Sequence, residues 1–138
     1  MYSRILVPVD LDNVDKLGKA LETAAEIAKR DGATVVYAGV VDTVPTPSAR
    51  PEAAVAKERL DRFAAEQAEA HGIETADQVA MRRDLHLNVG SELIGLAKKT
   101  DCDLIVMASH MPGLKDHVFS SNAGYVATHA PVSVYVVR

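Results

Sequence analysis

Short runs of consecutive apolar residues alternate along this chain with longer segments in which apolar residues recur at every third or fourth position. The short runs are typical of strands buried on both faces of a parallel sheet, and the spaced pattern is typical of helices that bury one side. The pattern predicts strands at residues 4–9, 33–41, 78–81, 104–107 and 132–137. It predicts helices between them, at residues 14–31, 51–71, 90–100 and 121–129.

Residues that favour the ends of helices flank these segments. Asp12 or Asn13 is expected to cap the first helix, and Asn88 is expected to cap the third. Gly32 and Gly72 suit the stops of the first and second helices, because glycine adopts the left-handed backbone that ends many helices.

Strands and helices that alternate along a chain form a parallel sheet with helices on both faces. We therefore expect an α/β fold, a single-domain doubly wound open parallel sheet of five strands over residues 1–138. In such sheets, ligands bind beyond the carboxyl ends of the strands, where the winding direction reverses. That rule indicates Asp10 after the first strand, Val40 near the end of the second, and the segment after the fourth.

Charge and composition narrow the classes of function. The chain has 15 basic and 19 acidic residues, and a formal net charge of -4 gives no reason to expect nucleic acid or an anionic membrane as a partner. No apolar stretch approaches the length of a membrane span, and the start does not have the pattern of a signal peptide. With Cys102 as its one cysteine, the chain forms no internal disulfide, so we expect a cytoplasmic location.

No motif of a catalytic centre is recognised in the sequence. Neither G-x-x-x-x-G-K-[ST] nor an H-x-G-H pair occurs, which argues against a P-loop NTPase or a nucleotidyl transferase. His110, His117 and His129 lack the spacing of metal ligands, so we expect no metal site. Ser109 and His110 do not form a hydrolase triad with Asp116, because no G-x-S-x-G elbow is present. A binding protein is favoured over an enzyme, although a slow ATPase activity stays open.

Three segments carry a resemblance that covers nearly the whole chain. The start "RILVPVD", the stretch "DLIVMASH" and the end "HAPVSVYVVR" resemble the first strand, the fourth strand and the end of the universal stress protein family. "ASH-x-P" resembles one subgroup of that family. The resemblance implies strand order 3-2-1-4-5 and a regulatory role in stress response. It also implies homodimers, often made by antiparallel pairing of the last strands.

Many members of that family bind ATP through a pattern of Gly, two residues, Gly, nine residues, Gly and then Ser or Thr. This chain departs from the pattern. The positions at or near the three glycines are occupied by Ala108, Met111 and Ser120, and the loop is one residue shorter. Ser121 keeps the hydroxyl group of the final Ser or Thr. Before the third helix, Leu87 and Val89 stand near positions where binding members often have Gly and Pro, so the loop there is expected to be reshaped.

The effect of Ser120 depends on the backbone that this position requires. If the position is left-handed, serine costs about 1–2 kcal/mol. If it is a helix cap, serine is favourable and its hydroxyl can donate to phosphate. We expect the fourth helix to begin at Ser120, Ser121 and Asn122, where free backbone N–H groups and the positive end of the helix dipole favour an anion.

The expected ligand is therefore ATP or another adenine nucleotide, with Mg²⁺ only as a companion of the nucleotide. By the resemblance, Asp10 and Val40 fall where binding members contact adenine and ribose, although Asp10 also suits a plain capping role. The alternative is a dimeric interaction module that has lost nucleotide binding. The expected binding residues are Pro8, Val9, Asp10, Val40, Ala108, Ser109, His110, Met111, Gly113, Ser120, Ser121, Asn122 and Ala123.

The last predicted strand is apolar and belongs at an edge of the sheet. An open edge strand of this kind invites aggregation unless it is covered. Together with the resemblance, this predicts a homodimer through Val132, Val134, Tyr135 and Val136. A further protein partner is expected, but the sequence does not identify it.

Overall fold

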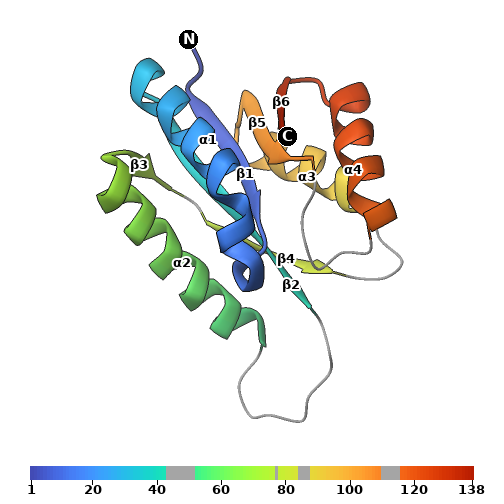
Figure 1. Ribbon diagram of the computed structural model, residues 1–138, viewed down its shortest axis with the longest axis horizontal. Helices are drawn as coiled ribbons and strands as arrows, with labels where there is room; N and C mark the ends of the chain where they lie inside the picture. The colour runs from blue at the N-terminus through green and yellow to red at the C-terminus, as the bar shows by residue number, and fades with distance from the viewer. Residues whose placement is uncertain (43–51, 77, 84–87, 110–115) are drawn as a thin grey trace.

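The computed structural model describes residues 1–42, 52–76, 78–83, 88–109 and 116–138, and it shows an α/β fold built on one parallel sheet (Figure 1). The elements are β1 (Arg4–Val9), the 3-10 helix η1 (Leu11–Leu17), α1 (Gly18–Asp31), β2 (Thr34–Asp42), α2 (Glu52–His71), β3 (Glu74–Thr75), β4 (Val79–Arg83), α3 (Val89–Lys99), β5 (Leu104–Ala108), α4 (Asp116–His129) and β6 (Ser133–Val137). The strand order is β3-β2-β1-β5-β6, and β4 also pairs with β2. The predicted fold class and strand order are confirmed.

The helices form two layers around the sheet. The chain steps from β1 to β2 and then to β3 and β4 on one side, and it continues to β5 and β6 on the other side of β1. Right-handed crossovers therefore place α1 and α2 on one face and α3 and α4 on the other. Figure 1 shows α2 beside α1, and α4 beside α3. Within the described ranges, no helix is both long enough and apolar enough to cross a membrane.

The middle strands of the sheet form the centre of the core. In β1, Ile5, Leu6 and Val9 have no exposed surface, and all five residues of β5 are buried. A strand covered by helices on both faces has no solvent side, so it is apolar at every position. This is why the apolar runs of the sequence located both strands correctly.

Several predicted helix ends are confirmed. Gly32 and Gly72 follow α1 and α2 with φ angles of 69° and 64°, the left-handed backbone that glycine adopts without strain. Asn88 caps α3, because its Oδ1 accepts a hydrogen bond from the backbone N–H of Ser91 at 3.2 Å.

The predicted start of the first helix is wrong. Neither Asp12 nor Asn13 caps it; both lie inside η1, which Asp10 caps, and α1 begins only at Gly18. Asn13 itself has a non-helical φ of -134°. The periodic apolar residues continue through η1 into α1, so the sequence pattern does not distinguish a 3-10 turn from the helix that follows it.

The third predicted strand, at residues 78–81, corresponds to β4, whereas the short strand β3 before it was not predicted. Between Val35 and Ala38 the pairing of β2 with its outer neighbour shifts by one residue, so β3 and β4 are separate short strands. At this interruption the side chain of Gln78 supplies the hydrogen-bond acceptor that the backbone of a neighbouring strand would otherwise supply. Its Oε1 accepts a hydrogen bond from the backbone N–H of Tyr37 at 2.7 Å, and both residues are buried.

We predict that Gln78→Met destabilises the protein by about 1–3 kcal/mol, because it leaves the buried N–H of Tyr37 without an acceptor. Gln67→Met is the matched control. The Oε1 of Gln67 is buried and has no hydrogen-bond partner in the described ranges, so its removal is expected to be neutral or stabilising. Urea denaturation measures the free energy of unfolding of both variants. An equal loss of stability in the two variants would contradict the role of Gln78.

Candidate functional site

The carboxyl ends of β1 and β5 lie side by side. The helical connections that follow these two strands run over opposite faces of the sheet and in opposite directions. The register pairs Ile5 with Leu104 and Leu6 with Ile105. Continued along the strands, it brings Asp10 level with Ser109. The rule for open parallel sheets places ligands at this edge.

Asp10 is buried at this edge, with 4% of its surface exposed. Its Oδ1 accepts a hydrogen bond from the backbone N–H of Asp12, and its Oδ2 accepts one from Nδ2 of Asn13, both at 3.0 Å. The capping role considered for Asp10 is therefore confirmed. Each carboxylate oxygen has more than one lone pair, so these two bonds leave acceptor capacity for a further donor.

The predicted start of the last helix is wrong, and this changes how the helix could hold an anion. α4 begins at Asp116, so Ser120, Ser121 and Asn122 lie inside it. The N–H groups that an α-helix leaves free are its first four, which here belong to residues 116–119. The backbone N–H groups of Ser121 and Asn122 are therefore not free to bind phosphate. Serine is a good cap, but it is also tolerated inside a helix, and no Gly or Pro interrupts residues 116–121.

At two of the three positions where the family pattern has glycine, the backbone of this chain does not require one. Ala108 is the last residue of β5 and pairs with Val137 in regular parallel strands, a position where glycine offers no advantage. Ser120 lies in α4, so the hypothesis of a left-handed backbone at this position is wrong. Met111 lies outside the described residues.

Asn122 is a buried polar residue at the interface between α4 and the rest of the fold. It is 7% exposed, and its Nδ2 has no hydrogen-bond partner among the residues that the structure describes. A buried donor without an acceptor costs about 1–3 kcal/mol, so an acceptor from a ligand would be favourable at this position. Three residues further on, Tyr125 packs against Gly90 of α3, where an added Cβ would lie 2.8 Å from the ring.

The other expected residues differ in their surroundings. Pro8, Val9, Ala108 and Ala123 are apolar and buried. The backbone N–H of Ser109 donates to the carbonyl oxygen of Val137 at 2.8 Å. Of three others only the backbone is described: it is strand at Val40 and helix at Ser120 and Ser121. His110, Met111 and Gly113 lie outside the described residues.

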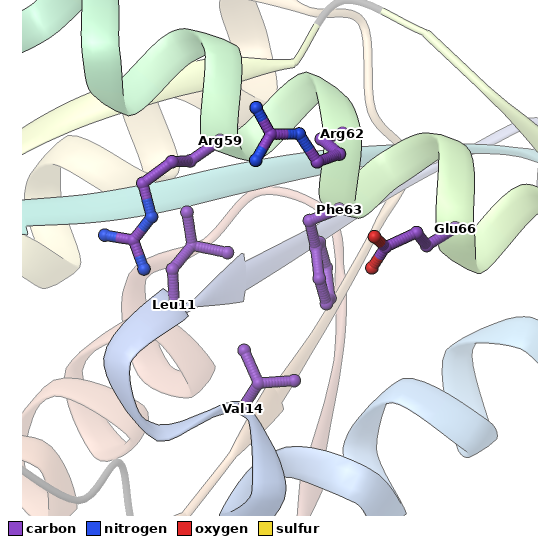
Figure 2. Close-up of a pocket in the computed structure, with 6 residues that line it drawn as sticks. All are labelled: Leu11, Val14, Arg59, Arg62, Phe63 and Glu66. Atoms are coloured by element: carbon purple, nitrogen blue, oxygen red, sulfur yellow. The ribbon is translucent and has the colours of Figure 1, made fainter.

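A cleft between η1 and α2 was not predicted from the sequence. It has a volume of about 270 Å³, and Figure 2 shows the side chains that line it: Leu11, Val14, Arg59, Arg62, Phe63 and Glu66. The pattern gave no signal for it, because it depends on the 3-10 turn that holds Leu11 and Val14 opposite α2.

The family comparison matches the whole chain. Residues 1–138 match the model of the universal stress protein family. The chain is also 29% identical to universal stress protein G of Salmonella typhimurium, over the full length of both.

Solved structures give the same result for the fold. The universal stress protein UspA from Lactobacillus plantarum has a TM-score of 0.68 and 28% identity, with 99% of this chain and 98% of that chain covered. A universal stress protein from Archaeoglobus fulgidus in complex with dAMP has a TM-score of 0.65 and 22% identity, with the same coverage.

The capping bonds of Asp10 generate a prediction about stability. Asp10→Ala removes the cap of η1 and should lower the free energy of unfolding by about 0.5–2 kcal/mol. Asn13→Ala removes only the bond from Nδ2 and should cost less. Thermal and urea unfolding of both variants tests this; a larger loss in Asn13→Ala would refute the capping role.

Proposed function

Because the chain belongs to the universal stress protein family, we propose that it is a stress-response regulatory protein that binds ATP or another adenine nucleotide at the carboxyl edge of β1, β2 and β5. A structure of the same fold holds dAMP, which makes an adenine nucleotide the first ligand to consider. The observation that carries the proposal is the buried Nδ2 of Asn122, on the helix that follows β5, which has no acceptor within the described part of the chain.

Asp10 supplies the complementary group. Its buried carboxylate accepts hydrogen bonds, so it suits the hydroxyls of a ribose or the amino group of adenine. The neighbouring Pro8, Val9 and Ala108 are apolar and buried, which suits the faces of a base or a sugar. The polar groups then orient the nucleotide, and the apolar groups exclude water from it.

The start of α4 is the natural place for the phosphates. The free N–H groups of residues 116–119 and the positive end of the helix dipole lie at the end of α4 that follows β5. Anions bind at such helix starts through backbone groups, so the loss of glycines lowers the affinity without removing the means of binding. Mg²⁺ enters this proposal only together with the nucleotide.

We also propose a cytoplasmic homodimer that associates through β6. β6 pairs only with β5 among the described strands, so its other edge is open. Tyr135 is 50% exposed, whereas Val132, Val134 and Val136 are half-buried. An apolar open edge of this kind is protected when a second copy covers it.

We predict that Asn122→Leu weakens ATP binding by about tenfold without lowering stability. The substitution removes a hydrogen bond to the ligand and also removes a buried donor that has no partner among the described residues. Gln67→Met, which removes an amide on α2 whose Oε1 is buried, should leave the affinity unchanged. Calorimetric titration with ATP measures the affinity of the unmodified protein and of both variants.

Two results of that titration would count against the proposal. Full affinity in Asn122→Leu would show that Asn122 does not contact the nucleotide. No binding by the unmodified protein at millimolar ATP would favour the alternative, a dimeric interaction module that has lost its nucleotide.

We predict that Tyr135→Asp shifts the dimer towards monomer, because a charge placed in an apolar interface is costly to desolvate. Val55→Asp is the matched control, since Val55 is also an exposed apolar residue, 40% exposed on α2, but far from β6 in the order of the sheet. Sedimentation velocity at micromolar protein concentration measures the proportion of dimer in each variant. A monomeric unmodified protein, or equal effects of both substitutions, would refute this interface.

A further inference from the structure

We propose that the cleft between η1 and α2 is a second ligand site, separate from the nucleotide site, and that it takes a small organic monocarboxylate with an apolar body. The cleft is lined by three apolar side chains, two guanidinium groups and one carboxylate. Each of these three kinds of group restricts the ligand in a different way.

The apolar side chains form a rigid floor. Phe63 is 8% exposed, and the buried ring of Tyr37 meets it edge to face with 5.1 Å between the ring centroids and 78° between the planes. Leu11 and Val14 are partly buried and pack against the same core. A floor held in place from behind loses little freedom when it binds an apolar group, which favours affinity.

Two guanidinium groups are available to a carboxylate. Arg62 forms no ion pair or hydrogen bond with any group that the structure describes. Arg59 pairs with Asp12 at 3.2 Å, but both side chains are well exposed, at 48% and 73%. Exposed ion pairs of this kind are weak, so a ligand carboxylate can take the place of Asp12 at little cost.

The two arginines also reinforce each other as an anion site. Residues three apart on a helix are neighbours on its surface, so Arg59 and Arg62 repel each other slightly while no anion lies between them. A carboxylate accepts two parallel N–H bonds from one guanidinium, which is the strongest geometry for such a pair.

Glu66 limits the charge of the ligand. It stands seven residues after Arg59, about 10 Å further along α2. Figure 2 shows the side chains of Arg59 and Glu66 at opposite ends of the cleft, with Phe63 between them. A carboxylate beside Arg59 avoids Glu66, whereas a dianion or a longer polyanion that reaches past Arg62 is repelled by Glu66, which neighbours Arg62 on the helix. The charges therefore favour a monocarboxylate over phosphate.

The volume of the cleft limits the size of the ligand. At about 270 Å³ it lies just below the range of about 300–1,000 Å³ that is typical of small-molecule pockets. A single aromatic ring or a short alkyl chain with one carboxylate fits this volume. An adenine nucleotide is larger and carries several negative charges, so it does not suit this cleft.

The test is an amide-resolved NMR titration of the full chain with sodium benzoate and with hexanoate, and with benzamide as the uncharged control. At about 10 mM probe, a site with a Kd near 1 mM approaches saturation. We expect saturable shifts for the two carboxylates at residues 11–14 and 59–66, and much smaller shifts for benzamide. Absence of saturable shifts in both segments, or equal binding of benzamide or of inorganic phosphate, would overturn the proposal.

Three variants at exposed positions test the charges without disturbing the core. Arg62→Gln should weaken benzoate binding by about two- to fivefold, and Glu66→Gln should tighten it by a similar factor. Arg30→Gln, which removes an exposed arginine from a different helix, should change nothing. An unchanged affinity in both Arg62→Gln and Glu66→Gln would overturn the assignment. The ATP affinity of these variants should equal that of the unmodified protein, which separates this site from the nucleotide site.

Discussion

The burial of β1 on both faces and along both edges is the constraint on which the rest of the structure depends. β1 lies between β2 and β5, and its apolar residues form the centre of the core. Its start is fixed as well, because the carboxylate of Asp103 accepts hydrogen bonds from the backbone N–H groups of Ser3 and Arg4. The strand therefore cannot slide, and the residue that follows it always leaves the sheet at the same point.

That residue is Asp10, at the edge of the sheet where ligands bind in folds of this kind. Its carboxylate caps η1, and we propose that the same carboxylate also binds the nucleotide. The capping bonds orient the group before any ligand arrives, so less freedom is lost on binding. They also hold η1 in place, and η1 carries Leu11 and Val14 into the second cleft. The turn from Asp10 into η1 thus lies beside both proposed sites.

The sequence predicted the parts of the fold that follow from burial, and it missed the parts that depend on local geometry. Continuous apolar runs located β1 and β5, because strands without a solvent face have no polar positions. The bulge before β4 was missed, since the replacement of a backbone acceptor by Gln78 leaves no mark on the apolar pattern. Ser120 and Ser121 suggested a helix start because they are good caps, but α4 begins before them. Asn122 was predicted to bind a ligand through its backbone N–H, whereas the structure draws attention to its buried side chain instead.

Whether an adenine nucleotide binds where β1 and β5 end is best measured by mapping the backbone amides that respond to ATP. We expect saturating ATP to shift the amide signals of Asp10, Ser109 and Asn122, while the signals of Arg59 and Arg62 beside the second cleft stay in place. Shifts confined to the cleft between η1 and α2, or no shifts at millimolar ATP, would contradict this expectation.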